Sequence, residues 1–161
     1  MARSIFASFH YDNDAHRVQQ VLQMGAIEGD SLVVAQKWEE VKRRSDAAIQ
    51  NWIDEQMKRK SAVVVLVGAQ TASRTWVDYE ICKAWDDKRP LVGIRIHGLK
   101  NLAQRTDSRG ANPFANVPLQ GGGSLDQHVD LHDPPGVNSK AVYASIESNI
   151  DAWIANAKKR S

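Results

Sequence analysis

Residues 62–85 read AVVVLVGAQTASRTWVDYEICKAW, and this stretch decides the fold. Its first seven residues are apolar and rich in β-branched side chains, which is typical of a parallel strand buried on both faces. After a polar turn comes a helical pattern with one apolar stripe, formed by Val77, Ile81, Ala84 and Trp85. A helix that begins just beyond the carboxyl end of such a strand faces the crevice where open α/β sheets bind ligands.

Glu80 lies at the border of this apolar stripe, roughly 80° from its centre at ~100° per residue. Trp76 is its i−4 neighbour. A carboxylate at such a border can be partly desolvated and still reach a ligand. The same position is typical of a half-exposed glutamate paired with a lysine such as Lys83 or Lys88. Helical position alone therefore leaves a catalytic and a structural interpretation of Glu80 open.

The composition is that of an ordinary soluble domain. The chain has 161 residues, of which 42% are apolar and 25% charged, and its formal net charge is +2. These values predict a single domain over residues 1–161 and give no indication of nucleic-acid binding. The one cysteine, Cys82, cannot form an internal disulfide, and its place beside Ile81 favours packing over nucleophilic catalysis. With no apolar run long enough to span a membrane, we expect a cytoplasmic protein.

Three further apolar runs predict strands at Ser4–Phe9, Ser31–Ala35 and Leu91–His97. Helical patterns separate them, and Asp12, Asn13 or Asp14 is predicted to cap the first helix. A helix over residues 46–57 has Trp52 and Met57 on its apolar face, which predicts core positions for both. Strands that alternate with helices predict an α/β fold with a parallel sheet covered on both faces.

The pattern is lost between His97 and Ser139, where glycine and proline recur. A long structureless connection is uncommon in a compact domain, so this segment is expected to be functional, mobile or to contain an irregular strand. Within it, Leu125–Leu131 is the best candidate for a short edge strand. The final helix, from Ser139, carries an apolar stripe that includes Ile146 and Ile150.

Several well-known sites are missing from the sequence. Neither a P-loop nor a GxGxxG fingerprint follows any predicted strand, and the histidines show no metal-ligand spacing, so no metal site is expected. His10, Asp12 and Asp14 gather after the first strand, as the acidic residues of receiver domains do. In receiver domains those acidic residues bind magnesium. Their chemistry also needs an aspartate at the end of the central strand, where this chain has Gly68.

Three blocks of sequence carry a resemblance to a known family. They are IFASFHYDND at residues 5–14, VVVLVGAQTASRTWVDYEI at residues 63–81, and LVGIRIHGLKN at residues 91–101 with the later GANPF. Together, and in this order, they resemble the Toll/interleukin-1 receptor (TIR) domains. The resemblance is closer to the bacterial TIR-like group that includes the TIR component of Thoeris anti-phage defence systems.

The resemblance implies a flavodoxin-like fold with a five-stranded parallel sheet. For the enzymatic members it implies cleavage of the nicotinamide–ribose bond of NAD, which is a substrate, with no cofactor. The catalytic glutamate of those members belongs to a WxxxE motif, matched here by Trp76 and Glu80. The loop after the second strand gates the cleft or mediates self-association, and it corresponds to Gln36–Ser45. The predicted substrate contacts are Ser8, Phe9, His10, Asp12, Trp38 and Trp76.

The chemistry that the resemblance implies is physically reasonable for one glutamate. Breaking this glycosidic bond builds positive charge on the ribose, and a nearby carboxylate stabilises that charge best where water is excluded. We expect an enzyme whose ADP-ribose-derived, cyclic product activates a separate effector in phage defence, in response to a phage-derived trigger. Two alternatives remain open: a non-catalytic TIR adaptor that acts by self-association, and a flavodoxin-like nucleotide binder.

Overall fold

A computed structural model describes residues 4–26 and 43–161 of the chain. Within them, parallel strands form one sheet in the order β1 (Ile5–Ser8), β2 (Ala62–Val67), β3 (Leu91–Arg95) and β4 (Leu131–His132). The apolar run of the sequence is β2, and every one of its residues is buried. A strand in the middle of a parallel sheet is covered on both faces, which explains its continuous apolar character.

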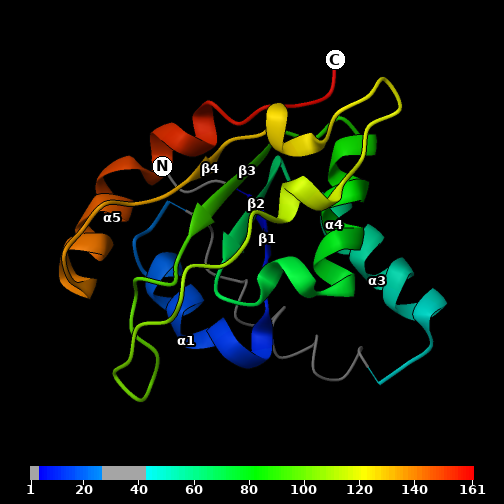
Figure 1. Ribbon diagram of the computed structural model, residues 1–161. Helices are drawn as coiled ribbons and strands as arrows, with labels where there is room; N and C mark the ends of the chain where they lie inside the picture. Colours follow the sequence, from blue (N-terminus) through cyan, green and yellow to red (C-terminus); the bar gives the residue numbers. More distant parts are fainter. Residues whose placement is uncertain (1–3, 27–42) are drawn as a thin grey trace.

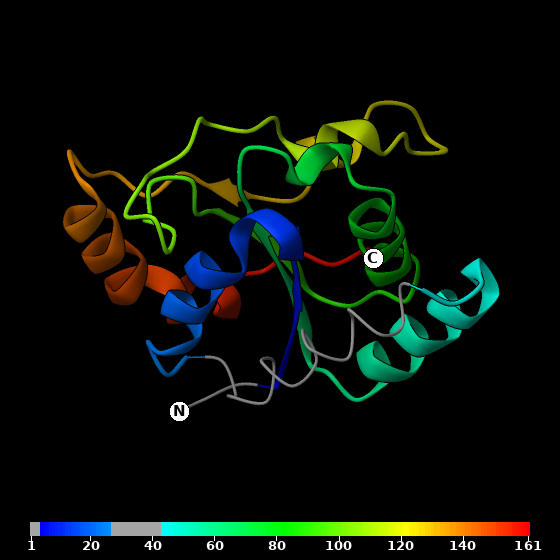
Figure 2. The same cartoon turned by 90° about the horizontal axis from the view of Figure 1, so that it is seen from below.

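Helices cover both faces of the sheet (Figures 1 and 2). On one face lie α1 (Tyr11–Leu22) and α5 (Ser139–Ala155), and on the other lie α3 (Asp46–Lys58) and α4 (Thr75–Asp86). Each face has its own core: Val21 and Ile146 belong to the first, and Ile53 and Ile81 to the second. The α/β fold with a parallel sheet and helices on both faces is therefore confirmed.

Helix starts differ slightly from the predicted ones. Helix α1 begins at Tyr11, so Asp12, Asn13 and Asp14 lie in its first turn and do not cap it. Acidic side chains in a first turn still complement the helix dipole. The N-cap of α3 is Ser45, whose side chain accepts a hydrogen bond from the Ala48 amide at 3.2 Å.

The segment between β3 and α5 is ordered but irregular. It contains two short 3-10 helices, η2 (Pro113–Asn116) and η3 (Leu125–Gln127), before β4. The prediction of an edge strand over Leu125–Leu131 was wrong for most of its length. Leu125 and Val129 are both buried, and the Val129 amide bonds to the Leu125 carbonyl at 3.0 Å, as in a helical turn. Only Leu131 of that range is in a strand, paired with Gly93 of β3.

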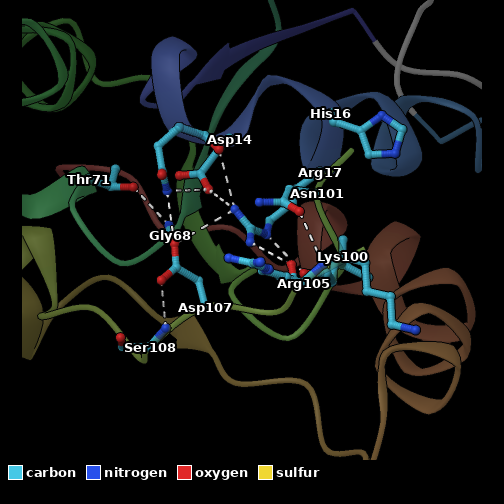
Figure 3. A network of polar contacts seen from close by, with 12 residues as sticks. Asp14, His16, Arg17, Gly68, Thr71, Lys100, Asn101, Arg105, Asp107 and Ser108 are labelled. Atoms are coloured by element: carbon cyan, nitrogen blue, oxygen red, sulfur yellow. Dashed lines mark hydrogen bonds and ion pairs between the residues drawn. The ribbon is translucent and has the colours of Figure 1, made fainter. Parts of the chain in front are cut away.

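The buried side chain of Arg17 in α1 holds the beginning of this segment through hydrogen bonds (Figure 3). Its side chain is 1% exposed and donates hydrogen bonds to the carbonyls of Leu99 at 2.8 Å and Arg105 at 2.9 Å. It also pairs with the buried carboxylate of Asp14 at 2.9 Å and lies 3.8 Å from Asp107. A buried guanidinium satisfied in this way holds the loop after β3 against α1.

Parts of the predicted fold lie outside the described residues. The predicted strand Ser31–Ala35 is one of them, and so are Trp38 and most of the loop Gln36–Ser45. A third short 3-10 helix, η1 (Thr71–Ser73), connects β2 to α4. Among the helices that are described, none combines the length and apolar character needed to cross a membrane.

Candidate functional site

Glu80 lies on the second turn of α4, beside the carboxyl end of β1. Its side chain is 8% exposed, and its Oε1 accepts a 2.7 Å hydrogen bond from the hydroxyl of Ser8, the last residue of β1. Ser8 lies on the same face of β1 as Phe6, whose side chain packs into the core beneath α3 and α4. The strand thus presents the hydroxyl to the one buried carboxylate of α4.

The interpretation of Glu80 as a surface residue paired with a lysine does not hold. Lys83 pairs instead with Asp87, with Nζ 3.3 Å from Oδ2. Within residues 4–26 and 43–161, the hydrogen bond from Ser8 is the polar contact that Glu80 makes. Glu80 is therefore a buried acidic group with little electrostatic compensation.

Burial raises the pKa of Glu80 to about 8, and the hydrogen bond from Ser8 opposes this rise. Removing a carboxylate from water disfavours its charged form, whereas a donated hydrogen bond favours it. Near neutral pH the group is consequently close to its own titration midpoint. Acidic groups with strongly raised pKa values are often found at functional sites.

A pocket of about 530 Å³ opens beside Glu80. It reaches from the carboxyl end of β1 along that strand toward Ile5 and Lys60. Aromatic side chains line it together with cationic ones. The aromatic residues are Phe6, Phe9, Tyr11, Trp52 and Trp76, and the basic ones are His10, Arg43, Lys60 and Arg74.

The structure brings most of the predicted site residues together. Phe9, His10, Asp12, Trp76 and Glu80 all line this pocket. Ser8 does not line the pocket itself but donates a hydrogen bond to Glu80, which does. Trp38 lies outside the described residues. The residues that leave β1 and the WxxxE helix are far apart in sequence, and the parallel pairing of β1 with β2 is what places them side by side.

Other pocket residues escaped prediction. Trp52 was predicted as a core residue; it does pack against the α3/α4 core, but it is only half-buried and also lines the pocket. Met57 is fully buried, as predicted. Arg74 occupies the N-cap position of α4, where its side chain makes no capping hydrogen bond. A cation at a helix N-terminus opposes the helix dipole. An arginine just before the predicted helix was therefore a sequence signal that could have identified Arg74 as a candidate functional residue.

The pocket has two chemically different parts. Exposed Arg43 and Arg74 supply positive charge at the rim, which suits an anionic group such as a diphosphate. Trp76 and Phe9 supply flat apolar surface next to Glu80, which suits a planar ring. Together they fit a ligand that carries both an anionic group and a planar ring.

The doubly covered parallel sheet and the WxxxE helix at its carboxyl edge define a TIR-like α/β protein. Residues 6–101 match the family model described as "Thoeris protein ThsB, TIR-like domain". The chain is also 34% identical over 185 residues to a Bacillus cereus (strain MSX-D12) protein named "Putative cyclic ADP-D-ribose synthase ThsB1". That alignment covers 97% of this chain and 94% of the relative. The chain belongs to the ThsB TIR-like family.

Proposed function

We propose that this protein cleaves the nicotinamide–ribose bond of NAD and closes the remaining ADP-ribose into a cyclic nucleotide. The observation that carries the proposal is Glu80, a buried carboxyl group held by Ser8 at the wall of a pocket lined by aromatic and basic side chains. The family relationship supports the same reaction, because the Bacillus cereus relative is named as a cyclic ADP-D-ribose synthase.

In this proposal the pocket binds NAD through its diphosphate and its nicotinamide ring. Its volume lies within the roughly 300–1,000 Å³ of small-molecule sites. Arg43 and Arg74 bind the diphosphate through charge-assisted hydrogen bonds, and Trp76 or Phe9 stacks on the nicotinamide ring. Nicotinamide in NAD carries a positive charge, which favours the ionised form of Glu80 and lowers its pKa when substrate is bound.

Glu80 then acts as an electrostatic catalyst. The bond between the ribose C1′ and the nicotinamide nitrogen breaks, and its electron pair leaves with the neutral nicotinamide. The carboxylate, whose side chain is only 8% exposed, stabilises the oxocarbenium-like ribose that remains. A nitrogen of the adenine attacks C1′ and a proton is released, so that NAD gives a cyclic product, nicotinamide and H⁺. Attack by water at the same carbon would give linear ADP-ribose.

The product is proposed to leave the protein as a signal. A diffusible nucleotide would activate a separate effector in phage defence, and a phage-derived trigger would switch synthesis on. The exposed arginines at the pocket rim make the site accessible to a small anionic ligand from solution.

The test follows nicotinamide release from NAD by purified protein, with and without lysate from phage-infected cells. Wild type and Glu147→Gln, a change at an exposed position of α5, are expected to release nicotinamide equally. Glu80→Gln should reduce release by about a thousandfold, typical of losing a main electrostatic group. Equal release by wild type and Glu80→Gln would overturn the role of Glu80.

Thermal unfolding separates the enzyme from an adaptor that only self-associates. NAD should raise the unfolding temperature of wild type and of Glu80→Gln, because the variant keeps the pocket's aromatic and basic residues. An adaptor would assemble with increasing protein concentration and gain no stability from NAD. A colourless protein that gains no flavin absorbance would dispose of the flavin-binding alternative.

A further inference from the structure

A second hollow of about 290 Å³ lies at the carboxyl ends of β3 and β4. Its walls include Arg95, His97, Asp133, Gly136 and Val142, and it shares no residue with the pocket beside Glu80. Carboxyl ends of parallel strands are where α/β sheets bind their ligands. Nothing proposed above for the Glu80 pocket uses these residues.

Arg95 is a buried cation with few partners. Its side chain comes from the last residue of β3 and is about nine-tenths buried. Of its five N–H donors, one reaches the Gly110 carbonyl at 3.3 Å, and its Nη1 lies 3.9 Å from Asp133. The buried Nε has no hydrogen-bond partner among the described residues. Burial lowers the pKa of Arg95, as expected for a guanidinium held without full compensation.

A second arginine shares the same counter-ion. Arg109 Nη2 lies 3.1 Å from Asp133 Oδ2, the oxygen that is also nearest to Arg95. Two guanidinium groups therefore meet one carboxylate, which leaves an excess of positive charge. His97 adds a further polar atom, since its buried Nδ1 has no hydrogen-bond partner within the part of the chain that the structure describes.

The backbone around the hollow is closely packed. A Cβ at Gly136 would lie 2.6 Å from the backbone nitrogen of Val142, and one at Gly98 would lie 2.9 Å from the side chain of Val142. Both loops can thus lie against the first turn of α5 because these two positions are glycine. The start of α5 also contributes partial positive charge to this end of the hollow.

We propose that this hollow is a binding site for the phosphate group of a small ligand, held by Arg95 and Arg109. Guanidinium groups bind phosphate through paired N–H···O bonds, and the unpartnered donors of Arg95 supply such bonds. Asp133 stands in for the anion while the site is empty and moves aside when phosphate binds. The phosphate is either free in solution or the end of a mononucleotide. This inference does not depend on the proposed cleavage of NAD.

The experiment titrates inorganic phosphate and AMP, separately and at constant ionic strength, and measures binding by isothermal calorimetry. Arg109 is 63% exposed, so Arg109→Gln should fold normally and weaken phosphate binding about tenfold, as expected for one charge-assisted hydrogen bond. Asp133→Asn should have the opposite effect and tighten binding several-fold, because it removes the competing carboxylate while keeping the shape of the side chain. Arg95→Lys keeps the charge but loses the paired geometry, and it should also weaken binding.

Two controls fix the location of the site. Arg160→Gln removes an exposed arginine elsewhere, one that lies 3.6 Å from Asp86, and should leave phosphate binding unchanged. Arg74→Gln removes a cation of the other pocket and should also leave phosphate binding unchanged, because Arg74 does not line this hollow. AMP that binds more tightly than phosphate, with the same sensitivity to Arg109→Gln and Asp133→Asn, identifies a mononucleotide as the ligand. Equal affinities identify free phosphate.

Opposite effects of Arg109→Gln and Asp133→Asn support the site. The proposal is overturned if wild type shows no saturable binding of either probe. It is also overturned if Asp133→Asn weakens binding as much as Arg109→Gln does. In that case the three side chains form a structural ion-pair network, in which every member is needed and none is displaced by a ligand.

Discussion

Ser8 and Glu80 are separated by 72 positions in the sequence, yet the Ser8 hydroxyl donates a 2.7 Å hydrogen bond to the Glu80 carboxylate. The contact joins the end of β1 to the second turn of α4 and holds the carboxyl group of a residue that lines the pocket. The hydroxyl favours the ionised form of Glu80, whereas burial opposes it. The charge of Glu80 near neutral pH is thus set jointly by β1 and α4.

Ser8→Ala should move the pH dependence of NAD cleavage to higher pH. Without the hydrogen bond the pKa of Glu80 rises further above its value of about 8, so less carboxylate is present at neutral pH. We expect kcat/KM at pH 7 to fall about tenfold, which corresponds to roughly one pKa unit. The pH profile should recover toward wild type in alkaline solution. Ser8→Thr keeps the hydroxyl and serves as control; an equal loss at every pH would contradict this account.

Glu80→Gln should stabilise the folded protein, and more so as pH rises. The folded-state pKa of about 8 lies above the ordinary value of 4.5, so the folded protein holds this proton more tightly than the unfolded chain does. Wild-type stability is then greatest below the ordinary pKa and falls as pH rises toward 8. The full loss is on the order of 3–5 kcal/mol.

Urea unfolding of both proteins at several pH values measures this difference. The two stabilities should be similar near pH 4 and diverge steadily up to about pH 8, with Glu80→Gln the more stable. Glu147→Gln, at an exposed position of α5, should follow the wild-type curve throughout. A constant gap between wild type and Glu80→Gln at all pH values would show that packing, and not ionisation, separates them.

Trp76 should report NAD binding by its fluorescence. It lines the pocket and makes an edge-on contact with Tyr79, with ring centroids 5.7 Å apart. Addition of NAD to Glu80→Gln, which prevents turnover, should quench the fluorescence, and Trp76→Phe should lose most of the quenching and weaken binding by roughly 1 kcal/mol. The matched control is Trp153→Phe, because Trp153 of α5 stacks on His132 of β4 and neither residue lines the pocket. Undiminished quenching in Trp76→Phe would place the nicotinamide elsewhere.

Gly68→Ala should destabilise the protein through Asp14. A Cβ at position 68 would lie 2.1 Å from Asp14 Oδ2, and Asp14 cannot move freely because it is buried and pairs with Arg17. We expect a loss of about 1–3 kcal/mol, as for other overpacked sites. Gly121→Ala is the control, since nothing lies within 4 Å of the added Cβ.

The double variant Gly68→Ala, Asp14→Ala identifies the cause of that loss. Asp14→Ala removes the colliding carboxylate, although it also leaves Arg17 without its buried partner. The two changes should therefore cost less together than the sum of their separate costs, by at least about 0.5 kcal/mol. Simple additivity in urea unfolding would mean that Gly68 and Asp14 act independently.

Local sequence was enough to identify the central elements. The short run at residues 62–68 is rich in β-branched side chains, which favours a strand, and the spacing of Val77 and Ile81 favours a helix. The family match confirms the resemblance of three sequence blocks to TIR domains. That resemblance predicted Phe9, His10 and Glu80 in one cleft, and all three line the same pocket. These residues flank the carboxyl ends of adjacent parallel strands, so the strand order fixes their proximity.

The tertiary structure decided what depends on contacts between distant segments. Sequence reasoning missed the hydrogen bond from Ser8 to Glu80, and it left the glutamate's burial and raised pKa undetermined. It also placed an edge strand over Leu125–Leu131, in a segment with little periodicity, where only the tertiary structure shows that Leu125 and Val129 pack as a helical turn. Arg17 was not singled out from the sequence, since its role depends on hydrogen bonds to the Leu99 and Arg105 carbonyls of the distant loop after β3. Periodicity reports which face of an element is buried, whereas the charge state of a buried group depends on which partners the fold brings within a few ångströms of it.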